Sequence, residues 1–406
     1  MYVSSVVGPG ILVLPGLAAH IAGPASLVAW VVLSLASYAF AYTFAMLSAR
    51  SPRSGGIYAF AMEGFGRTTA TVTGWLFVLW FITGSPAATL IAASYVAYAF
   101  PMPRDAVFLI AVTLVLTGFT VNAGGIVLSN RVQVIVVGAI LTLLVAAVAS
   151  SGWSVHPGSF VPFVPDGWMP VGTAAALIFW SYLGYENVSN VAEEFRDPQR
   201  DFRRSILLSV CAIGVLYVAT AVVTVGTESY RAGGSVAPFA AMFSRIFGSH
   251  GAAGTAILAL VITLGTVNVY TAGMSRVILA VARDGGLPRV FARVSPRTGA
   301  PTASLLLLSG LSVAMLAVYD VLAVDLQTAL LIPSGAAVVV YVIGSAAGIR
   351  LLRDRGWRRS LPWISLGMSV AVLPFVGSLA WAAILTGTVA MAYGWWRGRN
   401  REAEIG

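Results

Sequence analysis

The chain has 406 residues, of which 58% are apolar and only 10% are charged. Soluble domains carry about 25% charged residues, so this composition, with a mean hydropathy of +0.87, excludes a soluble globular enzyme. The lone Cys211 excludes a disulfide framework or a cysteine metal cluster. The three histidines are too scattered for a zinc site, and we therefore expect no metal and no cofactor.

Long charge-free runs predict an all-α polytopic membrane protein with about twelve transmembrane helices. A membrane span needs roughly 20 apolar residues, and its backbone polar groups must be satisfied within the helix itself. Divided at turn and charge signals, the runs predict spans over residues 3–22, 26–48, 71–99, 106–122, 131–150, 171–194, 205–226, 252–282, 301–318, 322–349, 361–377 and 379–396.

The arginines predict which side of the membrane each connection occupies. If both termini are cytoplasmic, the inner segments hold twenty-one arginines and the outer segments hold three, Arg104, Arg231 and Arg245. This asymmetry follows the positive-inside rule of multi-pass proteins of the inner (cytoplasmic) membrane. It accounts for the net charge of +9, so this charge does not indicate a nucleic-acid partner.

The amino-terminal segment carries no cleavable signal pattern. Met1 lies only seven residues before Gly8, where the first span is interrupted. At 1.5 Å per residue this is too short to cross half of the bilayer core, so we expect roughly ten further residues upstream of Met1. A truncated copy is the alternative.

The first predicted span is interrupted by Gly8-Pro9-Gly10, followed by Pro15. These residues free backbone groups that lipid cannot satisfy, and such a break is tolerated where it lines a cavity or meets a ligand. A proline kink packed against neighbouring helices is the alternative.

The sixth predicted span contains Gly184 and the carboxyl of Glu186 among several polar side chains. A carboxylate at bilayer depth costs about 2.5–3.5 kcal/mol, so Glu186 needs a partner, a proton or a water path. It is either a structural carboxyl bonded to backbone freed by the break or the group that couples transport to protons.

The two interruptions occupy the first and sixth spans, so each opens a five-helix half. Interrupted spans at matching positions are typical of the midplane site of transporters built from inverted repeats. Half-helix amino ends favour an anion and carbonyl ends favour a cation, which suits an amino acid zwitterion. No residue-level repeat supports the symmetry beyond these break positions.

Several short motifs follow one another along the chain, namely Gly8-Pro9-Gly10-Ile11, Pro52-Arg53-Ser54-Gly55-Gly56, Gly74-Trp75-Leu76-Phe77, Pro86-Ala87-Ala88, Trp180-Ser181-Tyr182-Leu183-Gly184-Tyr185-Glu186, Glu193 through Phe202, Asn268-Val269-Tyr270 and Asp284-Gly285-Gly286-Leu287-Pro288. In this order and spacing they resemble the amino acid–polyamine–organocation transporter superfamily over nearly the whole chain. Within it, the similarity is to the bacterial subfamily that exports methionine and branched-chain amino acids.

The resemblance implies a LeuT-type five-plus-five inverted repeat with two added helices. A single transporter domain would cover residues 1–396, with repeat one at about 1–150, repeat two at about 171–349 and accessory helices at about 361–396. Residues 397–406 would form a cytoplasmic tail.

The resemblance also implies a substrate site at the two breaks, with Trp180 as an aromatic lid and Tyr270 as a gate aromatic. Either aromatic could equally be core packing, and Asn268 either bonds to a neighbouring helix or lines the site. Glu186 is the residue we expect to couple protons. The expected substrate-binding residues are Ser5, Gly8, Gly10, Ile11, Trp180, Ser181, Gly184, Asn268 and Tyr270.

The sequence departs from the superfamily pattern at two positions that bear on substrate and ion binding. Pro9 replaces the usual serine or threonine between the glycines, and it has neither a hydroxyl nor an N–H for a substrate carboxylate. The fifth span, which begins near Gln133, contains no lysine, so the lysine that replaces a sodium ion in some relatives is absent.

These observations predict a secondary active transporter rather than an enzyme. The expected partners are a small neutral amino acid, a proton or alternatively sodium, and the lipid bilayer, and a homodimer is compatible with the sequence. The favoured mode is proton-linked efflux. An importer or exchanger of the same superfamily, for polyamines or cationic amino acids, is the first alternative. A non-transporting membrane sensor is the remote one.

Overall fold

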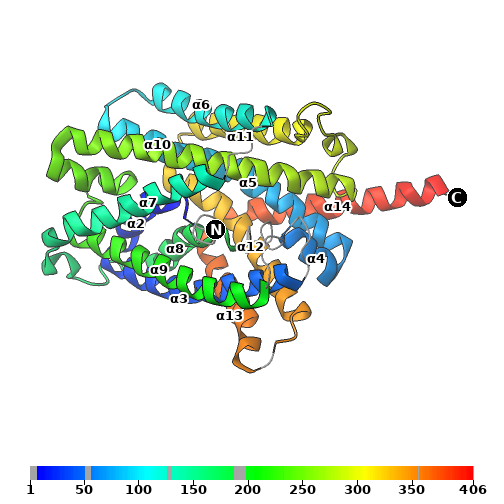
Figure 1. Ribbon diagram of the computed structural model, residues 1–406, viewed down its shortest axis with the longest axis horizontal. Helices are drawn as coiled ribbons and strands as arrows, with labels where there is room; N and C mark the ends of the chain where they lie inside the picture. Colours follow the sequence, from blue (N-terminus) through cyan, green and yellow to red (C-terminus); the bar gives the residue numbers. More distant parts are fainter. Residues whose placement is uncertain are drawn as a thin grey trace.

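The computed structural model describes residues 7–50, 56–125, 130–186, 198–231, 233–354 and 356–405, with side chains except at 130–133, 198–205 and 397–405. These residues form helices and connecting turns, without a strand (Figure 1). The helices are α2 (Gly10–Ala22), α3 (Ser26–Arg50), α4 (Ile57–Phe65), α5 (Arg67–Ala99), α6 (Arg104–Ala123), α7 (Asn130–Ser151), α8 (Met169–Ile178), α9 (Pro198–Gly226), α10 (Pro238–Arg283), α11 (Thr302–Val321), α12 (Leu326–Leu351), α13 (Leu361–Val372) and α14 (Ala380–Ile405).

Nine helical stretches of the described chain are long and apolar enough to cross a membrane. Two of them are pairs of spans joined at a glycine, Gly23 with φ 55° and Gly377 with φ 67°, a backbone conformation that glycine adopts at little steric cost. A shorter apolar helix covers Met169–Tyr182. Together these supply the twelve predicted apolar segments, and the expected polytopic all-α fold is confirmed.

The helices pair with counterparts five spans further along the chain. Contacts join α2 to α8, α3 to α9, α5 to α10, and α6 to α11. A second pair of contacts shows the same correspondence. Helix α5, the third span, packs against α12, the tenth, and α10, the eighth span, packs against α7, the fifth. Helices related by an inverted repeat are expected to show this pattern.

The central helices are α2, α5 and α12, most of whose side chains are buried. The α13–α14 pair lies outside them and exposes many large apolar side chains, among them Trp363, Trp381 and Leu385. In a bilayer these outer side chains face lipid, so the centre of the bundle is where a polar ligand could be held away from lipid.

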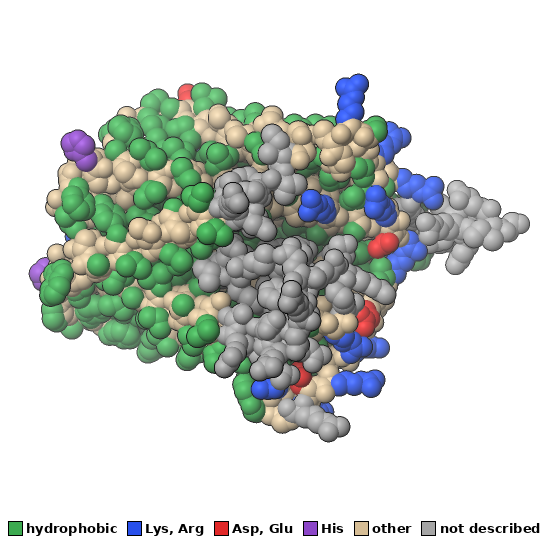
Figure 2. Space-filling model, viewed as in Figure 1, with side chains coloured by type: hydrophobic (Ala, Val, Ile, Leu, Met, Phe, Trp, Pro, Cys, Tyr) green, Lys and Arg blue, Asp and Glu red, His purple; other side chains and the backbone are tan. Residues whose placement is uncertain are grey.

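Charged side chains gather at one end of the bundle. On the face seen in Figure 2, most of the visible arginine side chains lie toward the end from which α14 projects in Figure 1, and the visible histidines lie at the opposite end. This distribution is what the uneven arginine count between alternate connections predicts.

The range of α10 contains a kink at Gly248, where φ is 60° and ψ is −146° and the backbone is not helical. The helix after this glycine corresponds to the predicted span 252–282, and a short helix that begins at Pro238 precedes it.

Helices α7 and α9 border an apolar groove whose lining includes Val145, Val148 and Cys211. Cys211 is exposed there.

Candidate functional site

Helix α2 starts in the middle of the first predicted span. Pro9 is its N-cap with φ −63°, and Gly10 is its first helical residue. The backbone N–H of Leu12 donates to the Pro9 carbonyl at 3.0 Å. The helix therefore begins at the predicted break, while Ser5 lies outside the described residues.

The helix of the sixth predicted span is also interrupted. After α8 the chain tightens into a 3₁₀ turn, η4 (Phe179–Tyr182), and Leu183 is then extended with ψ 151°. Gly184 follows with φ 116°, a left-handed conformation that disfavours any side chain. The helix of the sixth span therefore ends at the predicted break, because the extended Leu183 and the left-handed Gly184 cannot continue a helix. Residues 187–194 of this span lie outside the described residues.

The two breaks border one hollow at the centre of the bundle. Helices α5 and α10 complete it, and about 660 Å³ of atom-free space is present, including the space at its open mouth. The lining residues are Gly8, Pro9, Gly10, Trp80, Phe81, Gly84, Ser85, Ala88, Trp180, Ser181, Leu183, Thr266, Val267, Tyr270 and Met274.

Trp180 crosses this hollow between two glycines. A Cβ built on Gly10 of α2 would lie 2.8 Å from Trp180 Cδ1, and one on Gly84 of α5 would lie 3.2 Å from Trp180 Cη2. The two ends of the indole thus press against bare backbone on opposite walls. Side chains at either glycine would displace the ring.

The lining is largely apolar, and two of its hydroxyls are unsatisfied. The Oγ atoms of Ser85 and Ser181 are buried without a hydrogen-bond partner among the described residues. Buried polar groups are nearly always bonded to protein, water or a ligand. These two serines are therefore well suited to bind the polar end of a bound molecule.

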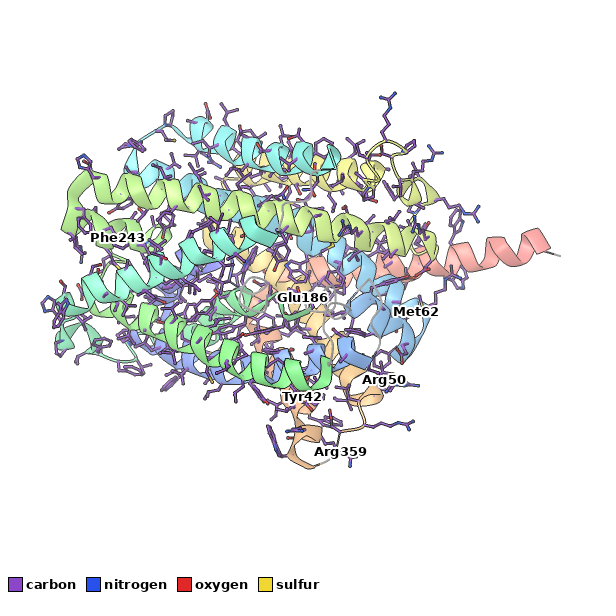
Figure 3. The ribbon with its side chains drawn as sticks, viewed as in Figure 1. Tyr42, Arg50, Met62, Glu186, Phe243 and Arg359 are labelled. Carbon is purple, nitrogen blue, oxygen red and sulfur yellow. The ribbon has the colours of Figure 1, made fainter. Side chains whose placement is uncertain are left out.

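Glu186 lies behind the hollow instead of in its lining, near the centre of the bundle (Figure 3). Its Oε2 accepts a hydrogen bond from the Gly184 N–H at 2.8 Å and another from the Tyr341 hydroxyl at 2.5 Å. The Gly184 N–H also reaches the Tyr341 oxygen at 3.2 Å. The carboxyl thus connects backbone freed by the sixth-span break to helix α12.

Aromatic rings hold the Tyr341 side chain in place. Phe40, Phe44 and Phe179 each pack edge-on against its ring, with centroid separations of 5.5, 4.8 and 5.4 Å. All four side chains are fully buried, so the hydroxyl can point in few directions other than toward Glu186.

The structure brings together five of the predicted substrate-binding residues and separates three others from the hollow. Gly8, Gly10, Trp180, Ser181 and Tyr270 line it. Ile11 and Gly184 are buried but do not line it.

Asn268 also lies away from the hollow. Its Oδ1 accepts a hydrogen bond from the Asn122 amide of α6 at 2.7 Å, and its backbone carbonyl accepts another at 3.1 Å. Of the two alternatives for this residue, the structure shows the bond to a neighbouring helix.

Tyr341 and the residues of the α5 wall were not among the predicted site residues. The small residues Gly84-Ser85-Pro86 interrupt an apolar span, as the first-span break does, and this was the available signal for Ser85. No cluster of three or more His, Cys, Asp or Glu suited to a metal ion occurs in the part of the chain that the structure describes.

Comparison with known proteins agrees with this architecture. A family model described as amino acid permease matches residues 1–396. The chain is 34% identical to an uncharacterized amino acid permease, YecA, of Bacillus subtilis, with 96% of this chain and 91% of that protein covered. It is 28% identical to the L-methionine/branched-chain amino acid exporter YjeH of Escherichia coli, with coverage of 92% and 89%.

The branched-chain amino acid permease BcaP of Bacillus subtilis is also similar, at 28% identity over 74% of this chain and 68% of its own length. The family match covers both breaks, the hollow and the accessory helices. The chain belongs to the amino acid permease family of the amino acid–polyamine–organocation superfamily.

Proposed function

We propose that this protein is a secondary active transporter of small neutral amino acids across the cytoplasmic membrane, working as a proton-linked efflux system. Alternating access would expose the central hollow to each side in turn. The relatives include one named as a methionine/branched-chain exporter and one named as a branched-chain permease, which supports neutral amino acids with apolar side chains as substrates.

The choice of a neutral substrate rests on the chemistry of the residues that line the hollow. Its residues are aromatic, aliphatic, glycine or hydroxyl-bearing, and none of those described is charged. A cationic amino acid or a polyamine needs a carboxylate to balance its extra charge in a desolvated site. The alternative of a cationic substrate therefore has less support.

The backbone and the two serines would hold the amino acid's polar groups. The free N–H groups at the start of α2 favour a carboxylate, and the unpartnered hydroxyls of Ser85 and Ser181 could donate to the carboxylate or accept from the ammonium group. Trp180 would then cover the apolar side chain of the substrate.

The test for substrate class is counterflow of radiolabelled methionine, leucine, arginine and putrescine in proteoliposomes. We expect the first two to exchange and the others not to. Ser85→Ala and Ser181→Ala should each weaken methionine binding about 2- to 12-fold, the cost of roughly 0.5–1.5 kcal/mol for one hydrogen bond. Ser312→Ala is the matched control, because the Ser312 hydroxyl is also buried and unpartnered among the described residues but lies outside the hollow.

For the coupling ion we propose Glu186 as the group that binds the transported proton, with Tyr341 positioning it. A proton on Glu186 would turn an oxygen that accepts two hydrogen bonds into a donor and so change the link between the sixth-span break and α12. Glu186→Gln keeps the side-chain size and should abolish pH-gradient-driven accumulation while leaving counterflow exchange intact. Accumulation at the parental rate would leave Glu186 a structural carboxyl and favour sodium coupling or facilitated exchange.

Tyr341→Phe tests the positioning role separately. It removes one hydroxyl and leaves the packing against the phenylalanines, so protein yield and counterflow should persist while the pH profile of accumulation shifts. An unchanged profile would mean that Tyr341 serves only packing.

We further propose that both termini are cytoplasmic and that residues 1–150 and 171–349 form the two repeats. The uneven distribution of arginines and the reciprocal helix contacts support this arrangement. Labelling of single cysteines introduced on a Cys211→Ala background should place 283–300 and 350–360 inside and 151–170 outside. Labelling of 151–170 from the cytoplasmic side would overturn the orientation.

A further inference from the structure

The connection between α12 and α13 carries an unusual concentration of positive charge. Residues 350–360, named here the arginine loop, hold five arginines and a single acidic residue, Asp354. Among the described arginines of this loop, Arg350, Arg353 and Arg359 are exposed and Arg358 is half-buried. None of these four takes part in an ion pair with another described residue.

The one acid of the loop does not neutralise these charges. Asp354 points inward, where its Oδ1 accepts a hydrogen bond from the buried Tyr42 hydroxyl of α3 at 3.2 Å. Its Oδ2 is buried as well. The four described guanidinium groups of the loop therefore make no ion pair, while the loop's own carboxylate faces the bundle.

The loop extends to the side of the bundle instead of covering its end. Figure 3 places Arg359 at the tip of a projection that leaves the bundle laterally, and Figure 2 shows arginine side chains along the same edge. Helix α12 ends at Leu351 and α13 begins at Leu361, so the loop lies at the depth where two spans leave the hydrocarbon. A lateral projection at that depth overlies lipid headgroups beside the protein.

Tryptophan side chains hold the arginine loop beside the bundle. Trp357 in the loop stacks on Tyr38 of α3 with ring centroids 6.3 Å apart, and the Arg358 guanidinium lies 6.0 Å from the centroid of the Trp357 ring. Trp357 nevertheless remains 62% exposed, and Trp363 at the start of α13 is 58% exposed. Exposed tryptophans are typical of the membrane–water interface.

We propose that the arginine loop is a binding site for the headgroup of an anionic phospholipid. Unpaired guanidinium groups form charge-assisted, frequently bidentate hydrogen bonds with phosphate oxygens. The tryptophans hold the loop at the depth of those phosphates, and the inward turn of Asp354 removes the competing carboxylate. A basic segment beside a span attracts anionic lipid by the same electrostatics.

The experiment uses the purified full-length protein in detergent, titrated with phosphatidylglycerol or phosphatidylcholine and followed by native mass spectrometry of retained lipid. Phosphatidylglycerol should bind in preference to phosphatidylcholine. The variant Arg353→Gln/Arg358→Gln/Arg359→Gln should lose roughly five-fold in that preference for each arginine removed. Glycerol phosphate, which has the headgroup charge without acyl chains, should not compete.

The matched control removes the same charge from the same end of the molecule. Arg289, Arg293 and Arg297 are exposed in the α10–α11 connection, and Arg289→Gln/Arg293→Gln/Arg297→Gln should keep the preference. An equal loss in both triple variants would show a general effect of net charge and overturn the site. Unchanged binding in the arginine-loop variant, or full competition by glycerol phosphate, would also overturn it.

Discussion

Adding one methyl group at Gly10 should displace the indole that crosses the central hollow. The Cβ of Gly10→Ala would lie 2.8 Å from Trp180 Cδ1 and 3.3 Å from Trp180 Nε1, closer than carbon atoms pack without repulsion. The ring cannot retreat toward α5, because its far end already lies against Gly84. It must therefore rotate or move into the hollow.

Forced rearrangements of this kind cost about 1–3 kcal/mol, which corresponds to roughly a 5- to 150-fold rise in the Kd for methionine. Gly8→Ala is the control from the same wall, because its Cβ would lie 3.6 Å from Thr266 Cγ2 in ordinary contact. Combining Gly10→Ala with Trp180→Phe should recover part of the loss, since the smaller ring leaves room for the methyl group.

The assay is equilibrium binding of radiolabelled methionine to purified protein, with the melting temperature measured in parallel to detect unfolding. A Kd for Gly10→Ala within two-fold of the parent value would refute the reasoning. Equal effects of the Gly8 and Gly10 substitutions would also refute it, because the indole would then not be the cause.

Three further outcomes follow from described contacts. Trp180→Ala should weaken binding of methionine and leucine far more than of alanine, and competition assays that show equal weakening would return Trp180 to core packing. Asp325 caps α12 by accepting from the Thr328 N–H at 2.9 Å and from its hydroxyl at 2.7 Å. Partial burial raises the pKa of this carboxyl, but hydrogen bonds from Thr328 and from the backbone of Asp325 and Gln327 together outweigh burial and hold the pKa below its usual range. Asp325→Ala should therefore cost about 1 kcal/mol of unfolding free energy at neutral pH, a difference that shrinks as pH falls through the lowered pKa. It is measured by thermal unfolding at several pH values, and a difference that grows toward acid pH would contradict it. Tyr58→Phe removes a 2.9 Å hydrogen bond to Asp284 between α4 and the α10–α11 connection and should cost about 1 kcal/mol by the same measurement, with no change meaning that water replaces the bond.

Local sequence signals predicted the breaks better than the walls between them. The sequence shows the breaks at Gly8-Pro9-Gly10 and at Gly184 because glycine and proline within an apolar span interrupt the helical hydrogen bonds that lipid cannot replace. Trp180 was predicted from the family resemblance of the motif that contains the second break. The sequence did not show the short helix that begins at Pro238 and ends at the kink at Gly248, nor the 3₁₀ turn with which the sixth-span helix closes before Leu183.

Contacts between helices far apart in the chain could not be read from the sequence. Ser85 belongs to the hollow only because α5 passes both breaks, and Tyr341 meets Glu186 across 155 positions of sequence. A mid-span asparagine needs a hydrogen-bond partner in either of its predicted roles. Only the packing of α6 against α10 shows that Asn268 finds this partner in Asn122.

Because Cys211 is the chain's only cysteine and is exposed in the groove between α7 and α9, the unmodified protein has one native attachment point for a spectroscopic probe. A nitroxide there would sit in lipid, between helices that come from opposite halves of the chain. Its mobility and its accessibility to dissolved oxygen would report any change in the width of the groove. Substrate-dependent motion of the bundle can thus be followed without first building a cysteine-free background.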